Sequence, residues 1–243
     1  MTTTDLNLNN TYYETLDENF KKALNLIERN FSHGELIKLL KEGNIPEKQF
    51  AALQLQTIKS EEEAQILVNN LTGQDGKIRE TVSLKINEFM SNKNLLTYFE
   101  NLQCYDTFLE AIIDINGNIC RNIIEAASNL ENNNAFCTYF CPKLADKTIS
   151  LIETIKTFNL QDGKYKINKE VFKLYWCLET IFRFHNTIDF NKLKYILLSA
   201  KNIDEYTIRE KTAKILSLGF EDKELQSARA ELKQDKNYYV RRF

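Results

Sequence analysis

Residues 60–90 read SEEEAQILVNNLTGQDGKIRETVSLKINEFM, and this stretch decides the fold. Ser60, followed three residues later by Glu63, is typical of a capping box at a helix N-terminus. Apolar residues then recur at the i, i+3, i+4, i+7 spacing of one helix face: Ala64, Leu67, Val68 and Leu71. Residues 73–76 (GQDG) predict a turn, and a second apolar stripe follows at Ile78, Val82, Ile86 and Phe89. The stretch therefore predicts a helical hairpin, two helices of about 10–15 residues joined by a short turn.

The composition favours helices over the whole chain. Among 243 residues, Gly occurs 7 times and Pro twice. All-β sandwiches and Gly-rich α/β folds use both residues in their turns, so this scarcity argues against both classes. Long stretches without either residue favour helices. We therefore expect an all-α fold, and the chain is long enough for one large domain or a short array of repeats.

An internal repeat is the most informative pattern. Four segments place an acidic or amide residue shortly before an arginine at the start of a predicted helix: residues 75–80, 116–122, 204–210 and 235–242. The arginines are Arg79, Arg121, Arg209 and Arg241, with spacings of 42, 88 and 32 positions, and 88 is two steps of 44. We expect a further unit between residues 130 and 200, where residues 162–164 repeat the Asp-Gly-Lys start of residues 75–77. A period near 40 is typical of two-helix solenoid repeats.

These segments resemble HEAT repeats from about residue 34 to residue 243, best over residues 34–90 and 204–219. The resemblance implies an all-α, right-handed α-solenoid of about five HEAT-like helical hairpins. We expect a flexible leader at residues 1–11 and a single solenoid domain at residues 12–243. Within it we predict an N-terminal capping helix (12–33), regular repeats (34–130), an irregular repeat (131–190) and C-terminal repeats (191–243), the last of them incomplete.

The recurring arginines have two interpretations. They could form a row of cations that binds an acidic partner or phosphates. Alternatively, each arginine pairs with a turn aspartate of its own or the adjacent unit and ties the repeats together, which is the reading that we favour and that the HEAT resemblance supports. This structural ladder would contain Asp75, Arg79, Arg121, Asp204, Arg209 and Arg241.

The net charge restricts the class of binding partner, and the cysteine count indicates the cellular compartment. The formal net charge is −2, without the basic excess of most nucleic-acid binders. No apolar run approaches the roughly 20 residues that span a bilayer, and residues 1–10 do not resemble a secretory signal. The five cysteines are an odd number, which argues against a disulfide framework and favours a reducing cytoplasm.

No recognisable catalytic, cofactor or metal motif is present. Cys137 and Cys141 share a helix face, but the only histidines, His33 and His185, are distant in sequence, so we interpret the thiols as core residues. Trp176 stands in an apolar helical pattern and is also predicted to be core. The pairs Tyr12-Tyr13 and Tyr238-Tyr239 are expected to cap the solenoid or to belong to a contact surface.

We therefore predict a non-catalytic, cytoplasmic protein–protein interaction scaffold or adaptor that needs no cofactor, binds a protein partner and does not associate with membranes. The expected contact positions on the second helices are Lys77, Glu80, Lys85, Glu210, Lys211 and Lys214. Two alternatives rest on fold analogy. One is a glycosylase of the DNA-alkylation-repair type, which needs a basic groove with exposed aromatic residues and one carboxylate. The other is a HEAT-like lyase or chaperone that acts on a client protein.

Overall fold

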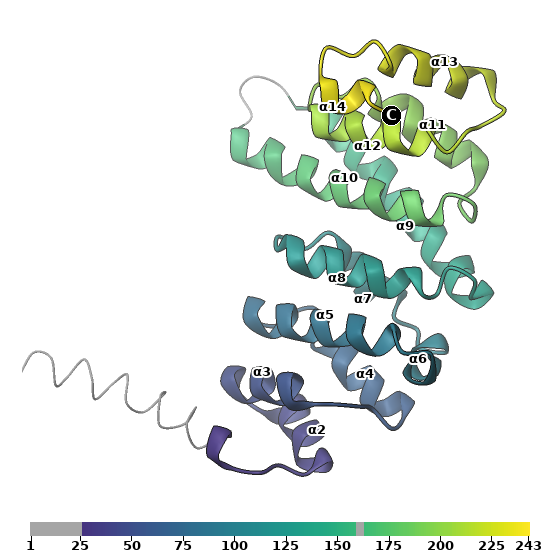
Figure 1. Ribbon diagram of the computed structural model, residues 1–243. Helices are drawn as coiled ribbons and strands as arrows, with labels where there is room; N and C mark the ends of the chain where they lie inside the picture. Colours follow the sequence, from purple (N-terminus) through teal and green to yellow (C-terminus); the bar gives the residue numbers. More distant parts are fainter. Residues whose placement is uncertain (1–25, 159–162) are drawn as a thin grey trace, which may run out of the picture. The chain divides into compact units, whose positions relative to one another are not determined.

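The computed structural model describes residues 26–158 and 163–243 (Figure 1). The chain forms two compact units, Met1–Gln56 and Thr57–Phe243. The predicted leader, most of the predicted capping helix, the Tyr12-Tyr13 pair and Asp162 lie outside the described residues. A single domain over residues 12–243 stays a prediction.

The described part of the first unit is a helical hairpin of α2 (His33–Glu42) and α3 (Ile45–Gln54). Each helix begins with a complete capping box, formed by Ser32 with Glu35 and by Asn44 with Glu47. The two helices contact each other, and their buried residues are Leu36, Leu40, Ala51 and Ala52. The small side chains of α3 allow the close contact that the sequence indicates.

All regular secondary structure in the described part of the second unit is helical. They are α4 (Glu61–Asn69), α5 (Gly76–Met90), α6 (Lys93–Glu100), α7 (Tyr105–Ile112), α8 (Gly117–Ser128), α9 (Asn134–Lys156), α10 (Lys164–Phe184), α11 (Phe190–Ala200), α12 (Tyr206–Leu216), α13 (Lys223–Leu232) and α14 (Tyr238–Arg241). Five consecutive pairs can be recognised: α4/α5, α7/α8, α9/α10, α11/α12 and α13/α14. The short helix α6 packs against α4 and α5.

The pairs stack in order along the second unit. The second helices form one row, in which α5 contacts α8, α8 contacts α10, α10 contacts α12 and α12 contacts α14 (Figure 1). In the other row α7 contacts α9, α9 contacts α11 and α11 contacts α13. Contacts between neighbouring pairs define a solenoid. The predicted all-α solenoid of about five HEAT-like hairpins is confirmed. We call the row α5, α8, α10, α12 and α14 the second-helix face.

Residues 131–190 contain a helical pair that is longer than its neighbours. Helices α9 and α10 have 23 and 21 residues, and Pro142 lies inside α9. Four buried phenylalanine rings from α7, α9 and α10 contact one another here: Phe108, Phe136, Phe140 and Phe184. The sequence departs from the repeat pattern in this segment because these helices are longer and share an aromatic core.

Candidate functional site

Two of the recurring arginines bind an aspartate of the next helical pair. Nε of Arg79 donates to Oδ2 of Asp114 over 2.8 Å, and Nε of Arg209 donates to Oδ2 of Asp235 over 2.7 Å. Each guanidinium also donates to backbone carbonyl oxygens in the turn before its own helix. Because each arginine is the fourth residue after the N-cap of its helix, both pairs have the same geometry.

The acidic partners are Asp114 and Asp235, not Asp75 and Asp204 as the HEAT resemblance implied. Both aspartates lie two residues before the N-cap of the next second helix and also accept that residue's backbone N–H, at 2.9 and 2.7 Å. Asp75 is instead the N-cap of α5, and Asp204 is exposed in the turn before α12. The sequence signal for the real partners is the tripeptide Asp-x-Asn that ends each turn, at residues 114–116 and 235–237.

Arg121 and Arg241 differ from the other two arginines. In α8 the fourth residue after the N-cap is Cys120, whose Sγ lies 3.2 Å from the backbone oxygen of Asp114. Arg121 is therefore shifted by one position, and it is exposed without a hydrogen bond or ion pair among the described residues. Arg241 donates to the backbone oxygens of Asp235 and Lys236, but no described carboxylate pairs with it.

The contact positions predicted on α5 differ in exposure. Lys77 is exposed. Glu80 is half-buried and accepts hydrogen bonds from the side-chain amides of Asn116 and Asn118, at 3.0 and 2.7 Å. Lys85 was predicted to face solvent, but only 7% of it is exposed, and its Nζ lies 2.8 Å from Glu88. Its aliphatic stem packs in the core while its charge is neutralised by the next helical turn.

Two of the three positions predicted on α12, Lys211 and Lys214, contact α10. Nζ of Lys211 and Nζ of Lys214 lie 2.5 and 3.1 Å from the carboxylate of Glu179. The two lysines also lie over aromatic rings of α10, Lys211 over Tyr175 and Lys214 over Phe182, at 4.5 and 4.1 Å from the ring centroids. We call these five residues the Glu179 cluster. It joins two neighbouring second helices and has more cations than carboxylates.

The charges of the Glu179 cluster stabilise each other. Burial alone would raise the pKa of Glu179, but the hydrogen bonds and charges of the two lysines outweigh it, and the pKa is lowered. Burial alone would lower the pKa of Lys211, but Glu179 and Tyr175 outweigh it, and the pKa is raised. Glu179 and Lys211 are therefore charged at neutral pH.

Exposed tyrosines and an arginine lie next to this cluster. Tyr206 on α12 and Tyr238 and Tyr239 on α14 are 40%, 63% and 52% exposed. The rings of Tyr206 and Tyr239 are 6.4 Å apart, and the guanidinium of Arg242 lies 5.4 Å from the Tyr239 ring. Arg242 also donates to Glu210 over 2.6 Å. We call Tyr206, Tyr238, Tyr239 and Arg242 the Tyr–Arg patch. It contains the Tyr238-Tyr239 pair that the sequence marked as a cap or contact surface.

Four residues could in principle serve as ligands, bases or stacking groups, and each is either buried or hydrogen-bonded to the backbone: Cys137, Cys141, His185 and Trp176. Cys137 and Cys141 are buried, and burial raises the pKa of the Cys141 thiol to about 11. Nδ1 of His185 lies 3.1 Å from the backbone oxygen of Phe182. Trp176 is 8% exposed and packs against Gly117.

The described residues form neither a metal-binding cluster nor a membrane-spanning helix. Within residues 26–158 and 163–243, no group of three or more His, Cys, Asp or Glu side chains is arranged to hold a metal ion. No helix in these ranges has the length and apolar character needed to cross a membrane.

Comparison with known proteins adds only distant structural likenesses. No family model and no curated protein matches the chain. It is similar to a designed armadillo repeat protein at 14% identity and a TM-score of 0.46, over 87% of this chain and 96% of that one. An engineered protein is similar at 16% identity and a TM-score of 0.48, over 88% and 95%. A designed armadillo repeat protein in complex with the peptide (KR)4 is similar at 13% identity and a TM-score of 0.47, over 87% and 96%. At TM-scores below 0.5, these likenesses say nothing about what the chain binds.

Proposed function

We propose that this chain is a protein-interaction scaffold that binds a partner on its second-helix face, with the Tyr–Arg patch as the main contact. The exposed tyrosines beside Arg242 are the observation on which the proposal rests. Tyrosine and arginine are enriched at the energetic centres of protein interfaces, because each combines a large contact area with directional hydrogen bonds. Solenoids commonly bind partners along such an extended face.

The charge around the patch indicates the chemistry of the partner. Four cations of α12 and α14 or their ends lie here: Lys211, Lys214, Arg241 and Arg242. Lys211 and Lys214 pair with Glu179, and Arg242 pairs with Glu210. Cations therefore outnumber carboxylates by two, and a partner surface with Asp or Glu side chains would complement them.

The glycosylase alternative has less support. It requires exposed aromatic residues beside a free carboxylate, whereas Trp176 is buried and Glu179 is paired with two lysines. No comparable observation favours a lyase or chaperone. We place the scaffold in the cytoplasm as part of the proposal, because all five cysteines are buried free thiols.

The test is a pull-down from lysate of the source organism, with the intact chain as bait and quantitative mass spectrometry as readout. The baits are the wild type, Tyr239→Ala, Arg242→Ala and the control Tyr165→Ala, which removes a 74% exposed tyrosine of α10 outside the patch. We expect the wild type to recover a partner protein whose binding survives nuclease treatment and moderate salt. Both patch variants should fail to recover this protein, whereas the control should still recover it. Recovery that disappears with nuclease, or that all baits share equally, would contradict the proposal.

A further inference from the structure

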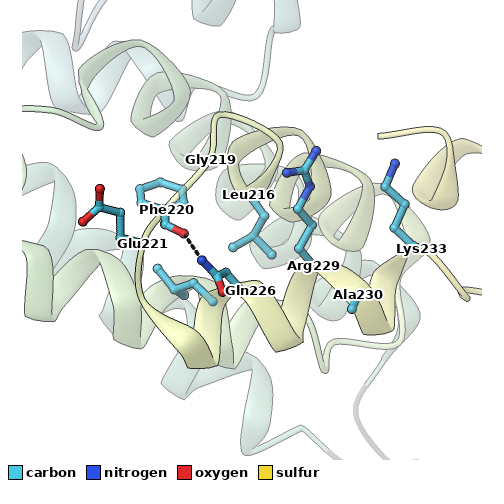
Figure 2. Close-up of a pocket in the computed structure, with 9 residues that line it drawn as sticks. Leu216, Gly219, Phe220, Glu221, Gln226, Arg229, Ala230 and Lys233 are labelled. Atoms are coloured by element: carbon cyan, nitrogen blue, oxygen red, sulfur yellow. Dashed lines mark hydrogen bonds between the residues drawn. The ribbon is translucent and has the colours of Figure 1, made fainter.

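A pocket of about 570 Å³ lies beside α13, outside the second-helix face (Figure 2). Its accessible apolar lining is Phe220 and Ala230, with Leu216 and Leu225 behind them at 1% exposure each. The loop Gly219–Glu221 borders it and is held by a 3.1 Å hydrogen bond from Nε2 of Gln226 to the backbone oxygen of Phe220. Gly219 has a φ of +89°, which glycine adopts without strain, so this loop geometry depends on a glycine.

Two cations line the other end of the pocket without a counter-charge. Arg229 and Lys233 are one helical turn apart, and Figure 2 shows them extending to the same side of α13. Neither side chain has a hydrogen bond or ion pair among the described residues, and Nε of Arg229 is buried without an acceptor. Like charges four positions apart on a helix repel each other, and buried donors normally have a partner. Lys233 is exposed and Arg229 is half-buried, so this end of the pocket presents two positive charges that no described carboxylate neutralises.

Four carboxylates within or beside α13 pair with other cations. Glu231 pairs with Lys201, Asp235 with Arg209, and both Asp222 and Glu224 with Lys194. The remaining acid of the pocket is Glu221, which precedes α13, whereas Arg229 and Lys233 lie in or after its last turn. The negative end of the helix dipole favours cations there, but it gives neither side chain an acceptor.

We propose that this pocket binds an acidic peptide segment of a partner protein. An Asp or Glu carboxylate of the peptide would accept hydrogen bonds from Arg229 and Lys233, and a neighbouring apolar side chain would pack against Phe220 and Ala230. The terminal nitrogens of Arg229 make the contact, because its Nε is covered. The volume lies within the range of about 300–1,000 Å³ typical of ligand pockets. A peptide provides both an anion and an apolar group, and the pocket presents a site for each.

The first step of the test selects ligands without assuming a partner. A random peptide library displayed on phage is panned against the intact chain, and the enriched peptides are labelled with fluorescein for anisotropy measurements. We expect enrichment of Asp or Glu next to Leu, Ile, Met or Phe. Arg229→Gln should weaken binding of these peptides at least tenfold, whereas Arg229→Lys, which keeps the charge, should weaken it less.

Two further variants separate the pocket from general effects. Lys233→Gln changes an exposed side chain that the fold does not need and should also weaken binding, so the proposal remains testable if Arg229→Gln unfolds. The control Lys223→Gln removes a cation at the other end of α13, outside the pocket, and should bind like the wild type. Circular dichroism checks the fold of each variant.

Three results would overturn the proposal. In the first, enriched peptides lack acidic residues or bind Arg229→Gln and Lys233→Gln as tightly as the wild type. In the second, enriched peptides lose affinity for Tyr239→Ala instead, which would support the Tyr–Arg patch and leave the pocket without a role. In the third, light scattering finds a dimer of the chain that Arg229→Gln dissociates, which would assign the pocket to a second copy.

Discussion

Arg209 and Asp235 are 8% and 9% exposed at their side chains, which makes their ion pair more enclosed than that of Arg79 and Asp114, at 19% and 11%. Removing one partner of an enclosed pair costs more, because the remaining charge stays buried without compensation. The same residue type therefore contributes differently to stability at equivalent positions of two repeats. Arg121, which has no partner, provides the matched comparison.

We predict that Arg209→Ala lowers the free energy of unfolding by about 3 kcal/mol. Arg79→Ala should lower it by about 1–2 kcal/mol, because its pair is more exposed to solvent. Arg121→Ala should change it by less than about 0.5 kcal/mol, since the side chain is exposed and unpaired. Urea unfolding followed by circular dichroism measures all three. Equal losses for the three variants would show that the arginines do not tie the repeats together.

The Arg209 pair also predicts a pH dependence. The hydrogen bond and charge of Arg209 hold the pKa of Asp235 below its ordinary value of 3.8. A carboxyl group whose pKa is lowered by folding stabilises the fold above the unfolded pKa, and this contribution is lost as the pH falls through the folded value. The wild type should therefore be more stable than Asp235→Asn at pH 7, and the difference should shrink below about pH 4.

The measurement for this prediction is urea unfolding of both proteins between pH 7 and pH 3. Asp204→Asn is the control, because Asp204 is exposed and forms no ion pair with any described residue. A difference between wild type and Asp235→Asn that stays constant over the whole range would show that the charge of Asp235 is not what stabilises the fold.

Sequence reasoning found the recurring arginines but not their acidic partners. The arginines were visible because the same residue type recurs after similar turns. The aspartates belong to the next repeat, 35 and 26 positions further along the chain, so a search for a partner within the arginine's own turn misses the Asp-x-Asn tripeptide that contains them. Lys85 was misjudged for a related reason, since a long side chain on an amphipathic helix can be buried along its stem while its charge is paired locally.

At the scale of the elements, the starts of α5 and α8 share Gly and Ile at equivalent positions after the N-cap but have different surroundings. Gly76 and Gly117 each follow the N-cap of their helix. A Cβ at Gly117 would lie 3.3 Å from the ring of Trp176, whereas a Cβ at Gly76 would meet nothing within 4 Å. The packing of α10 on α8 therefore requires a small residue at Gly117 only.

We predict that Gly117→Val costs about 1–3 kcal/mol more than Gly76→Val, because the added side chain overpacks the contact with Trp176. The low helix propensity of valine affects both variants equally at the first helical position, so it cancels in the comparison. Trp176 is the only tryptophan, so its fluorescence reports this contact directly. Its emission should shift in Gly117→Val but not in Gly76→Val, and equal stability losses with unchanged emission would contradict the packing.

The helix boundaries were predicted best where a side chain next to the boundary caps the helix. Ser60 caps α4 by accepting the N–H of Glu63, as the sequence indicated. The Glu63 carboxylate, however, accepts from the backbone N–H of Lys59 rather than from that of Ser60. The segment 131–190 was less predictable, because the lengths of α9 and α10 follow from tertiary packing of their phenylalanine rings and not from the repeat pattern.

At the scale of the whole molecule, the five cysteines report on the integrity of the helical stack. They belong to the second unit, and all are buried. Burial raises the pKa of Cys104, Cys120 and Cys177 to about 12. Since the thiolate is the reactive form, native thiols should react poorly near pH 8.

We predict that a thiol reagent at pH 8 modifies all five cysteines in denaturant but only slowly in the native protein, at a rate limited by opening of the stack. Mass spectrometry counts the modified sites over time. Modification of any cysteine within the dead time of mixing would show that this cysteine is not buried in the native protein.

The central claim is that the second-helix face binds a protein through the Tyr–Arg patch. The most direct measurement is site-specific photo-crosslinking in lysate of the source organism, with a photoreactive phenylalanine analogue at position 239 or, as controls, at the exposed tyrosine positions 139 and 165. Position 239 alone should trap a defined protein, before and after nuclease treatment. Crosslinks from the control positions only, or no protein trapped at position 239, would contradict it.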